Sequence, residues 1–267
     1  MDRNIIVCGN GPSVAKIDFR RVPDDVKVMR TTAFYFEEKY LVGKRVDYYV
    51  EYYKRIVDQY FNIRTINDKN EYDFDLENTW WTVMFENNKH FPTAKSCTQL
   101  IQEQPLIAEF RCFYEFYYGK YLPTGMQAIA LACCLGFNNI YLTGFDLFSD
   151  MCNLHPWTDG KSVADRINQY ERTSIYNTTG GSEKSVDISG YINKRHPVDM
   201  QIKFIYLLRK LFPATRFYSV SEKSAINEHV EMAPVLYETP WYSHQDKPAD
   251  RTTEWYPLPE EMPSRAI

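Results

Sequence analysis

The sequence predicts an α/β protein with a single Rossmann-like parallel sheet, flanking helices and a small lid. The first observation is an apolar run at residues 5–8 that stops at Gly9-Asn10-Gly11, which is typical of a buried parallel strand. The second is a strand at 139–144 directly after an apolar helix at 126–135, as in a βαβ unit. The third is the polar stretch 149–190, which we interpret as a lid because such long loops are usually functional or disordered.

The other elements follow from local patterns along the chain. Short apolar or β-prone runs predict further strands, at residues 26–29, 46–52, 80–85 and 216–220. Helix-forming or amphipathic runs predict helices, at residues 97–118 with a break at Pro105, at 199–212 and at 224–233. Weaker patterns predict a helical turn at 34–40, a helix ending at 59–60, an acidic surface loop at 67–78 and a short helix at 163–173.

Composition narrows the class of protein. The 267 residues are 44% hydrophobic, enough for a full core, and the net charge of −4 argues against a nucleic-acid partner. The six cysteines form no C-x-x-C pair and the five histidines no H-E-x-x-H motif, so we expect no metal site and reduced thiols. No leader and no apolar run of about 18 residues is present, so we expect a cytoplasmic protein.

The turn at Gly9-Asn10-Gly11 is the first candidate for ligand binding. Pro12 suits the first turn of a helix, and unpaired N–H groups at a helix start favour a phosphate. The turn matches neither G-x-G-x-x-G nor the P-loop pattern, so a nucleotide site and a plain tight turn both stay open. Asn10 could donate its amide to a phosphate or cap the helix.

Polar residues gather where the predicted strands end. Gly9-Asn10-Gly11, Thr31-Thr32 and Gly144-Phe145-Asp146 each follow a strand, and ligands of open parallel sheets bind beyond the carboxyl ends of the strands. Asp146 would contact a sugar hydroxyl or hold a helix N-terminus. We therefore divide the chain into a nucleotide-binding domain (1–148 and 191–235), a lid that covers the acceptor (149–190) and a C-terminal tail (236–267), extended from Pro240 onward and packed only in places.

His196 is the candidate general base. It lies just before a predicted helix, and the pKa of an imidazole suits proton transfer near neutral pH. A surface histidine at a helix start is the other interpretation. Arg195 could neutralise an anionic substrate or belong to a plain basic surface, and His155 in the lid could serve in packing or in binding.

Several stretches together resemble the bacterial lipooligosaccharide sialyltransferases of glycosyltransferase family 42. They span residues 5–13, 17–19, 34–40, 140–146 and 224–234. The resemblance covers about residues 1–235 and is strongest in the first forty. It implies a GT-A-like variant of the fold and an inverting, metal-independent transfer of sialic acid from CMP-sialic acid, without a cofactor, to a galactose-type acceptor on lipooligosaccharide or capsule. It also implies a homo-oligomer, commonly a tetramer, and peripheral contact with the inner membrane.

The resemblance assigns roles to single residues. Asn10, with Gly9 and Gly11, matches the glycine-flanked asparagine near the donor phosphate. Thr124 and Gly125 match the Ser-Gly pair of the nucleotide pocket. Gln59 matches a donor-site glutamine, Tyr191 a tyrosine of the donor pocket, and His196 is the histidine near the position of the catalytic base. We also assign Thr32 and Asp146, which follow predicted strands, to the donor site. Arg195 is assigned to the leaving phosphate for its charge, and His155 as a possible replacement for a phosphate-binding tyrosine.

This sequence also departs from the family pattern. The departures stand at Thr32-Ala33 in place of Asn-Gln, at Glu51 or Tyr52 in place of an asparagine, at Tyr121 in place of an arginine and at Phe148 in place of a tyrosine. His196 lies two residues later than expected. Two alternatives therefore stay open: a transferase for another activated sugar (Kdo, another nonulosonate or a UDP-sugar), and a degenerate member that binds a nucleotide or glycan without catalysis.

Overall fold

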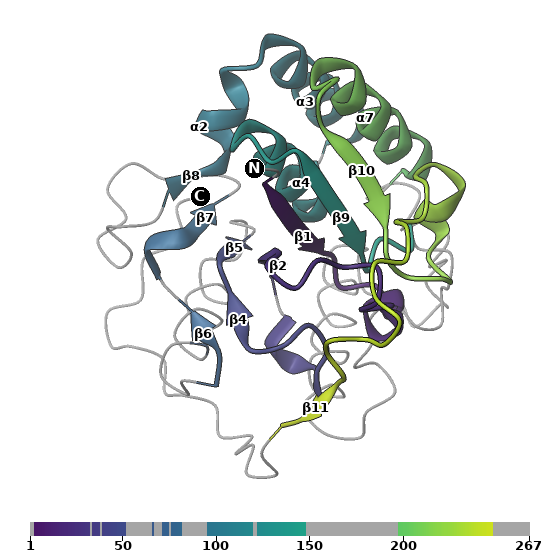
Figure 1. The fold of residues 1–267 in the computed structure, drawn as a ribbon. Helices are drawn as coiled ribbons and strands as arrows, with labels where there is room; N and C mark the ends of the chain where they lie inside the picture. The colour runs from purple at the N-terminus through teal and green to yellow at the C-terminus, as the bar shows by residue number, and fades with distance from the viewer. Residues whose placement is uncertain are drawn as a thin grey trace, which may run out of the picture.

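The computed structural model describes residues 3–51 except 33 and 38, residue 66, residues 71–81 except 75, and residues 95–119, 122–147 and 197–247. Within them, a seven-stranded sheet has the order β10-β9-β1-β2-β5-β7-β8, and all neighbouring strands are parallel (Figure 1). The strands are β1 (Asn4–Cys8), β2 (Lys27–Thr31), β5 (Tyr48–Glu51), β7 (Thr79–Trp81), β8 (Lys95–Ser96), β9 (Asn139–Thr143) and β10 (Arg216–Ser219). The predicted α/β fold with one parallel sheet is confirmed.

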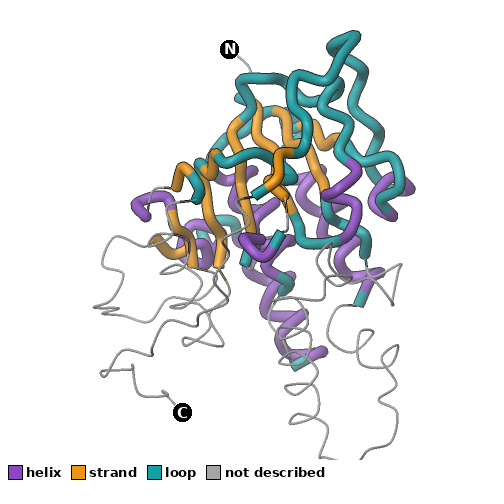
Figure 2. The backbone as a smooth tube through the Cα atoms, turned by 90° about the horizontal axis from the view of Figure 1, so that it is seen from below, coloured by secondary structure: helices purple, strands orange, loops and turns teal. Residues whose placement is uncertain are grey.

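The two faces of the sheet are covered differently. Within the described residues, four helices pack on one face: α2 (Cys97–Gln102), α3 (Pro105–Tyr118), α4 (Thr124–Cys134) and α7 (Val198–Leu211). Residues 14–26, 41–42, 220 and 233–242 cover the other face, without an α-helix (Figure 2). Ile5 and Val7 of β1 face the helices, whereas Ile6 and Cys8 face the irregular layer. The central strand is buried on both faces, and this explains its continuous apolar sequence.

Short elements complete the described part of the chain. They are η1 (Pro12–Lys16), η2 (Phe34–Phe36), β3 (Lys39–Tyr40), β4 (Arg45–Val46), β6 (Asp73–Phe74), η3 (Leu76–Asn78), η4 (Ala225–Glu228) and β11 (Gln245–Asp246). The strand predicted at 46–52 is divided, because β4 pairs with β6 outside the main sheet while β5 enters it. The stretch 67–78 was expected to be loop throughout, but it contains β6 and η3.

The helix predicted at 224–233 is wrong beyond its first turn. Only η4 is helical, and the residues after it run parallel to the end of β10, where Met232 is paired with Ser219. The Ser219 N–H donates to the Glu231 carbonyl over 2.8 Å, and the Ala233 N–H donates to the Ser219 carbonyl over 2.9 Å. Pairing with the edge of the sheet therefore supplies the hydrogen bonds that a longer helix would have made internally.

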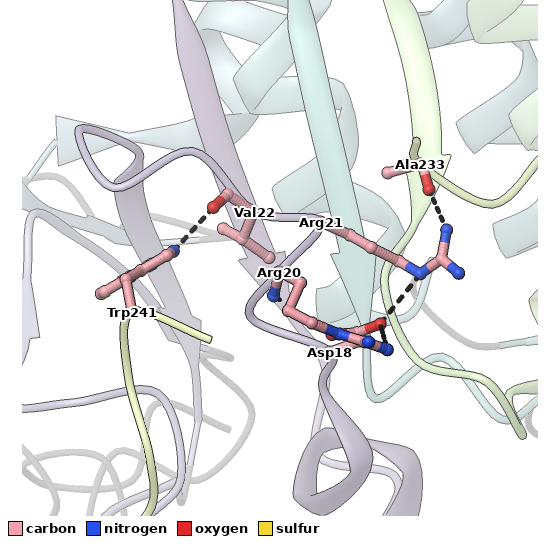
Figure 3. A network of polar contacts seen from close by, with 6 residues as sticks. All are labelled: Asp18, Arg20, Arg21, Val22, Ala233 and Trp241. Carbon is pink, nitrogen blue, oxygen red and sulfur yellow. Dashed lines mark hydrogen bonds and ion pairs between the residues drawn. The ribbon is translucent and has the colours of Figure 1, made fainter. Parts of the chain in front are cut away.

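The C-terminal strap, residues 234–247, lies against the irregular layer. Trp241 donates its indole N–H to the Val22 carbonyl over 2.7 Å, and Arg21 bridges Asp18 and the Ala233 carbonyl just before the strap (Figure 3). Near its end the strap pairs with β3, and buried Lys247 donates to the Tyr35 carbonyl over 2.8 Å. An extended tail that packs in places is what the sequence predicts here.

A buried ion pair fixes the segment after β2. The Arg30 and Glu37 side chains face each other and are each 1% exposed. The guanidinium carbon of Arg30 lies 4.5 Å from the centre of the Phe34 ring, and Glu37 accepts the Leu41 N–H over 3.3 Å. The pair therefore ties residues 34–41 to the central sheet.

Some predictions lie outside the described residues. They are the lid at 149–190 with its short helix, and the helix that ends at 59–60. Among the helices that the structure describes, none has the length and apolar character needed to cross a membrane.

Replacing Arg30 by methionine removes the guanidinium that faces the Glu37 carboxyl group. We expect the free energy of unfolding, measured in urea, to fall by ~3–5 kcal/mol, because a buried charge loses its partner. The double variant Arg30→Met/Glu37→Leu is the matched control. It should recover most of the loss, since apolar residues can replace a buried pair at little net cost. Equal instability of the two variants would contradict this account.

Candidate active site

The carboxyl ends of β1, β2 and β9 meet at one edge of the sheet. The Gly9 N–H donates to the Thr143 carbonyl over 2.8 Å, and the Gly11 N–H donates to the Gly144 carbonyl over 2.9 Å. The strand order changes direction at β1, which lies between β2 and β9, and ligands of open α/β sheets bind beside such a point. The predicted convergence of the three strand ends is confirmed.

Two glycines allow the turns after β1 and β9 to touch. A Cβ atom on Gly9 would lie closer than 3.0 Å to the Gly144 carbonyl oxygen, and one on Gly144 equally close to that of Gly9. Gly144 also has a φ of 71°, which residues with a Cβ adopt at a cost. Both positions therefore require glycine, Gly9 for space and Gly144 for space and conformation.

Helix α4 begins at the same edge. Thr124 and Gly125 are its first two residues, and a Cβ atom on Gly125 would lie 2.8 Å from Cε1 of Phe145. The missing side chain therefore lets the helix start lie against the residue that follows Gly144. The predicted pair Thr124 and Gly125 is thus brought beside the turns, and its contact with a nucleotide stays a prediction.

Asp146 holds the N-terminus of η1. Its Oδ2 accepts the Ser13 N–H over 2.8 Å, and the Ser13 hydroxyl oxygen accepts the Gly144 N–H over 3.1 Å. The side chain of Asp146 is nearly buried. Of the two roles considered for Asp146, holding a helix start is confirmed by this contact, and contact with a sugar stays a prediction.

The expectation of unpaired N–H groups after Gly11 is wrong. The element is a 3-10 helix of 5 residues, and Pro12 has no N–H. Ser13 donates to Asp146, and Val14 donates to the Gly11 carbonyl over 3.1 Å. The anion at this helix start is the protein's own carboxylate, so a donor phosphate would have to displace it.

Asn10 is oriented by the end of β2. Its amide nitrogen donates to the Thr31 carbonyl over 3.0 Å and to the Thr32 hydroxyl over 2.7 Å. The N-cap of η1 is Gly11, without a side-chain hydrogen bond, so the predicted capping role of Asn10 is wrong. Both bonds orient the Asn10 side chain at this edge, and the predicted donation of its amide to a phosphate stays a prediction.

Comparison with known protein families identifies the chain. A family model of alpha-2,3-sialyltransferases (CST-I) matches residues 3–244. The chain belongs to this sialyltransferase family. It is therefore a glycosyltransferase that transfers sialic acid. No curated protein matches the chain.

Solved structures with the same fold come from Campylobacter jejuni. The monofunctional alpha-2,3-sialyltransferase Cst-I has a TM-score of 0.74 and 22% identity, over 97% of this chain and 90% of that one. CstII in complex with the substrate analogue CMP-3FNeuAc has a TM-score of 0.73 and 22% identity, over 92% of each chain. CstII with a trisaccharide acceptor and CMP has a TM-score of 0.70 and 21% identity, over 92% of each chain. At this identity the agreement concerns the fold.

Several predicted site residues of this sialyltransferase lie outside the described residues. They are Gln59, His155, Tyr191, Arg195 and His196. The same holds for four positions where the sequence departs from the family pattern: Ala33, Tyr52, Tyr121 and Phe148. Their roles stay predictions, and the described part of the site consists of the sheet edge and the start of α4.

Sequence reasoning missed polar residues that build this edge. The hydroxyls of Thr143 and Ser221 share a hydrogen bond of 2.8 Å, and Ser224 donates to the Phe145 carbonyl over 3.0 Å. Glu51 at the end of β5, already named as a departure from the family pattern, is 2% exposed, and its Oε2 lies against the Tyr49 hydroxyl. All follow or end parallel strands, so the strand-end rule that selected Thr31-Thr32 would have found them too.

The described edge offers mainly neutral hydrogen-bonding groups. Burial raises the pKa of the Cys8 thiol to about 11 against the opposing effect of Arg30, so this cysteine stays protonated and is a poor nucleophile. No cluster of three or more His, Cys, Asp or Glu side chains is placed to hold a metal ion in the part of the chain that the structure describes. Hydroxyls, amides and backbone groups can orient a sugar nucleotide there.

Replacing Gly144 by alanine tests the contact between the two turns. Gly119 is a matched control, because it has a φ of 59° but nothing within 4 Å of an added Cβ atom. Both variants carry the left-handed backbone cost of ~1–2 kcal/mol. Only Gly144→Ala also forces the turns apart, so urea unfolding should show an additional loss of ~1–3 kcal/mol. Equal losses would show that the turns tolerate a side chain.

Proposed function

We propose that this protein transfers sialic acid from CMP-sialic acid to a galactose-type acceptor on a bacterial surface glycan, a lipooligosaccharide or a capsule. The observation that carries the proposal is the family match over residues 3–244. CstII structures that contain CMP, CMP-3FNeuAc and a trisaccharide acceptor support this choice of substrates. The glycine-lined strand ends support a nucleotide site at the same edge of the sheet.

The proposed reaction is a single displacement with inversion at the anomeric carbon. His196 takes the proton of the acceptor hydroxyl while the hydroxyl oxygen forms the new glycosidic bond. The bond to the phosphate oxygen breaks at the same carbon, and CMP leaves with the bonding electrons. Arg195 and His155 stabilise the departing phosphate, and the lid at 149–190 keeps water from the donor.

The donor would bind across the described edge. We assign it to Gly9-Asn10-Gly11, Thr32 and Asp146 at the strand ends and to Thr124-Gly125 at the start of α4, with Gln59 and Tyr191 completing the pocket. The Asp146 carboxylate already occupies the helix start. We therefore expect the phosphate to rely on Arg195 and His155 rather than on the N–H groups of η1.

Three further properties rest on the resemblance of the sequence to its family. They are chemistry without a metal or cofactor, peripheral contact with the inner membrane, and assembly into a homo-oligomer, commonly a tetramer. A cytoplasmic location is proposed separately, from the cysteine pattern of the sequence.

Helix α3 offers a surface for such an assembly. Leu106, Phe113, Phe116 and Tyr117 lie along one side of it and are 48%, 48%, 87% and 68% exposed. Exposed apolar patches often mark contacts between proteins. Exposed Glu109 on α3 and the exposed lysines of the neighbouring helix α7 have opposite charges, which suits contact between two copies. A monomeric form of CstII has also been solved.

The variant His196→Ala tests the proposed base. We expect kcat for transfer from CMP-sialic acid to fall about 10²–10⁴-fold, with the affinity for CMP in calorimetry unchanged. His229→Ala, outside the proposed site, is the control and should keep full activity. EDTA should leave the rate of the wild type unchanged.

The outcomes separate the candidate functions. Full activity of His196→Ala would remove the proposed base. Binding of CMP without turnover across sialic acid, Kdo and other CMP-activated donors would favour a non-catalytic member of the family. Thermal stabilisation by UDP rather than CMP would change the donor class.

The double variant Phe116→Ser/Tyr117→Ser tests the α3 surface. Light scattering of the wild type should give a multiple of the chain mass of 31.6 kDa, and the variant should shift towards a single chain because its apolar contact is lost. Val235→Ser changes a residue of the strap that is 51% exposed and should leave the mass unchanged. A monomeric wild type would contradict the proposed assembly.

A further inference from the structure

Thr32 has an uncommon backbone conformation at the proposed donor site. Its φ is 44°, in the left-handed region, where a β-branched residue is a genuine outlier. Such a conformation costs ~1–3 kcal/mol and persists only when the surroundings hold it. Thr32 directly follows β2 at the strand-end edge, so the contacts that hold it bear on the site.

Tyr49 of the neighbouring strand β5 supplies one of the contacts that hold Thr32. Its hydroxyl has one hydrogen, which it shares between the Thr32 carbonyl, 2.8 Å away, and a carboxylate oxygen of Glu51. The Thr32 N–H in turn donates to the Val50 carbonyl over 3.0 Å. The Tyr49 side chain is fully buried, and its ring meets the rings of Phe34 and Phe74 edge-on at 5.7 Å and 5.6 Å. This packing fixes where the hydroxyl lies.

Glu51 gives the Tyr49 hydroxyl a second contact. Residues two apart on a strand share a face of the sheet, and the Tyr49 hydroxyl meets Oε2 of Glu51 as well as the Thr32 carbonyl. Both partners lie at the carboxyl edge. The hydroxyl is therefore directed towards the site rather than into the aromatic cluster.

The effect of Tyr49 reaches Asn10 through Thr32. The Thr32 hydroxyl accepts one hydrogen bond from the Asn10 amide over 2.7 Å, and the Thr31 carbonyl accepts the other over 3.0 Å. If Thr32 relaxed from its left-handed conformation, its Cβ and hydroxyl would rotate away. One of the two bonds that orient Asn10 would then be lost.

We propose that Tyr49 is a positioning residue for donor binding. It holds the Thr32 backbone through its hydroxyl, and Thr32 in turn holds the Asn10 amide. Tyr49 acts through Thr32 and not by contact with the donor. This inference rests on the proposed function, because it requires the donor to bind at the turn that contains Asn10.

A double-mutant cycle between Tyr49→Phe and Thr32→Val tests the proposal. Thr32→Val removes the hydroxyl that Asn10 contacts but keeps the branched shape. We expect Tyr49→Phe to raise the Kd for CMP and the KM for CMP-sialic acid about five- to tenfold, as the loss of one hydrogen bond predicts, with kcat changed less than about twofold. In the Thr32→Val background, Tyr49→Phe should raise Kd and KM by less than about twofold, because the hydrogen bond between the Thr32 hydroxyl and Asn10 is already absent.

Tyr48→Phe is the matched control. Tyr48 is the neighbouring residue of β5, and its ring packs against Phe137 among the residues of the helical layer. Its loss of a hydroxyl should change neither Kd nor KM. Thermal midpoints measure the stability of each variant. Partial unfolding would lower the apparent kcat but would not raise the KM of the folded fraction.

Two results would overturn this inference and leave the proposed function intact. One is wild-type affinity for CMP in Tyr49→Phe. The other is an equal effect of Tyr49→Phe in the wild-type and Thr32→Val backgrounds, which would show that Tyr49 acts by another route. A wild type that does not bind CMP would overturn the proposed function and this inference together.

Discussion

The direct contact between the backbones of Gly9 and Gly144 is the constraint on which the site depends. Because neither residue has a Cβ atom, the turns after two neighbouring parallel strands approach until their N–H and carbonyl groups pair. Asp146 and Ser13 can then bond across the gap. This contact converts two separate strand ends into one continuous surface, and α4 reaches the same surface because residue 125 is also a glycine.

That arrangement has a consequence for the chemistry. The close approach that builds the edge also brings the Asp146 carboxylate to the start of η1, so the N–H groups there are used within the protein. The described edge is therefore better suited to orienting neutral parts of a sugar nucleotide than to neutralising its phosphate. In the proposed reaction, positive charge for the leaving group has to come from residues that the chain adds after β9, among which Arg195 and His155 are the candidates.

The sheet and its helical layer could be predicted because their residues are buried in regular patterns. The runs in β1 and β9 are apolar throughout, and α4 is buried along nearly its whole length, so local sequence reflects their surroundings. The conformation of the segment after η4 could not be predicted, because residues 231–233 pair with Ser219 of β10. Nothing in their own sequence pattern indicates this partner. The division of the strand predicted at 46–52 into β4 and β5 likewise depends on β6, which pairs with β4 and lies more than twenty residues further along the chain.

Hydrophobic pattern and glycine position are local properties, and they were enough to predict the fold class, the family and the group of strand ends that meet at the site. The roles of the polar residues at those ends became visible only in the folded chain. Asp146 holds a helix start, Asn10 bonds to the end of β2, and Tyr49 supports Thr32 from the neighbouring strand. A hydrogen bond depends on which partner the folded chain brings within reach, and residues 133, 22 and 17 positions apart meet here only because parallel strands align.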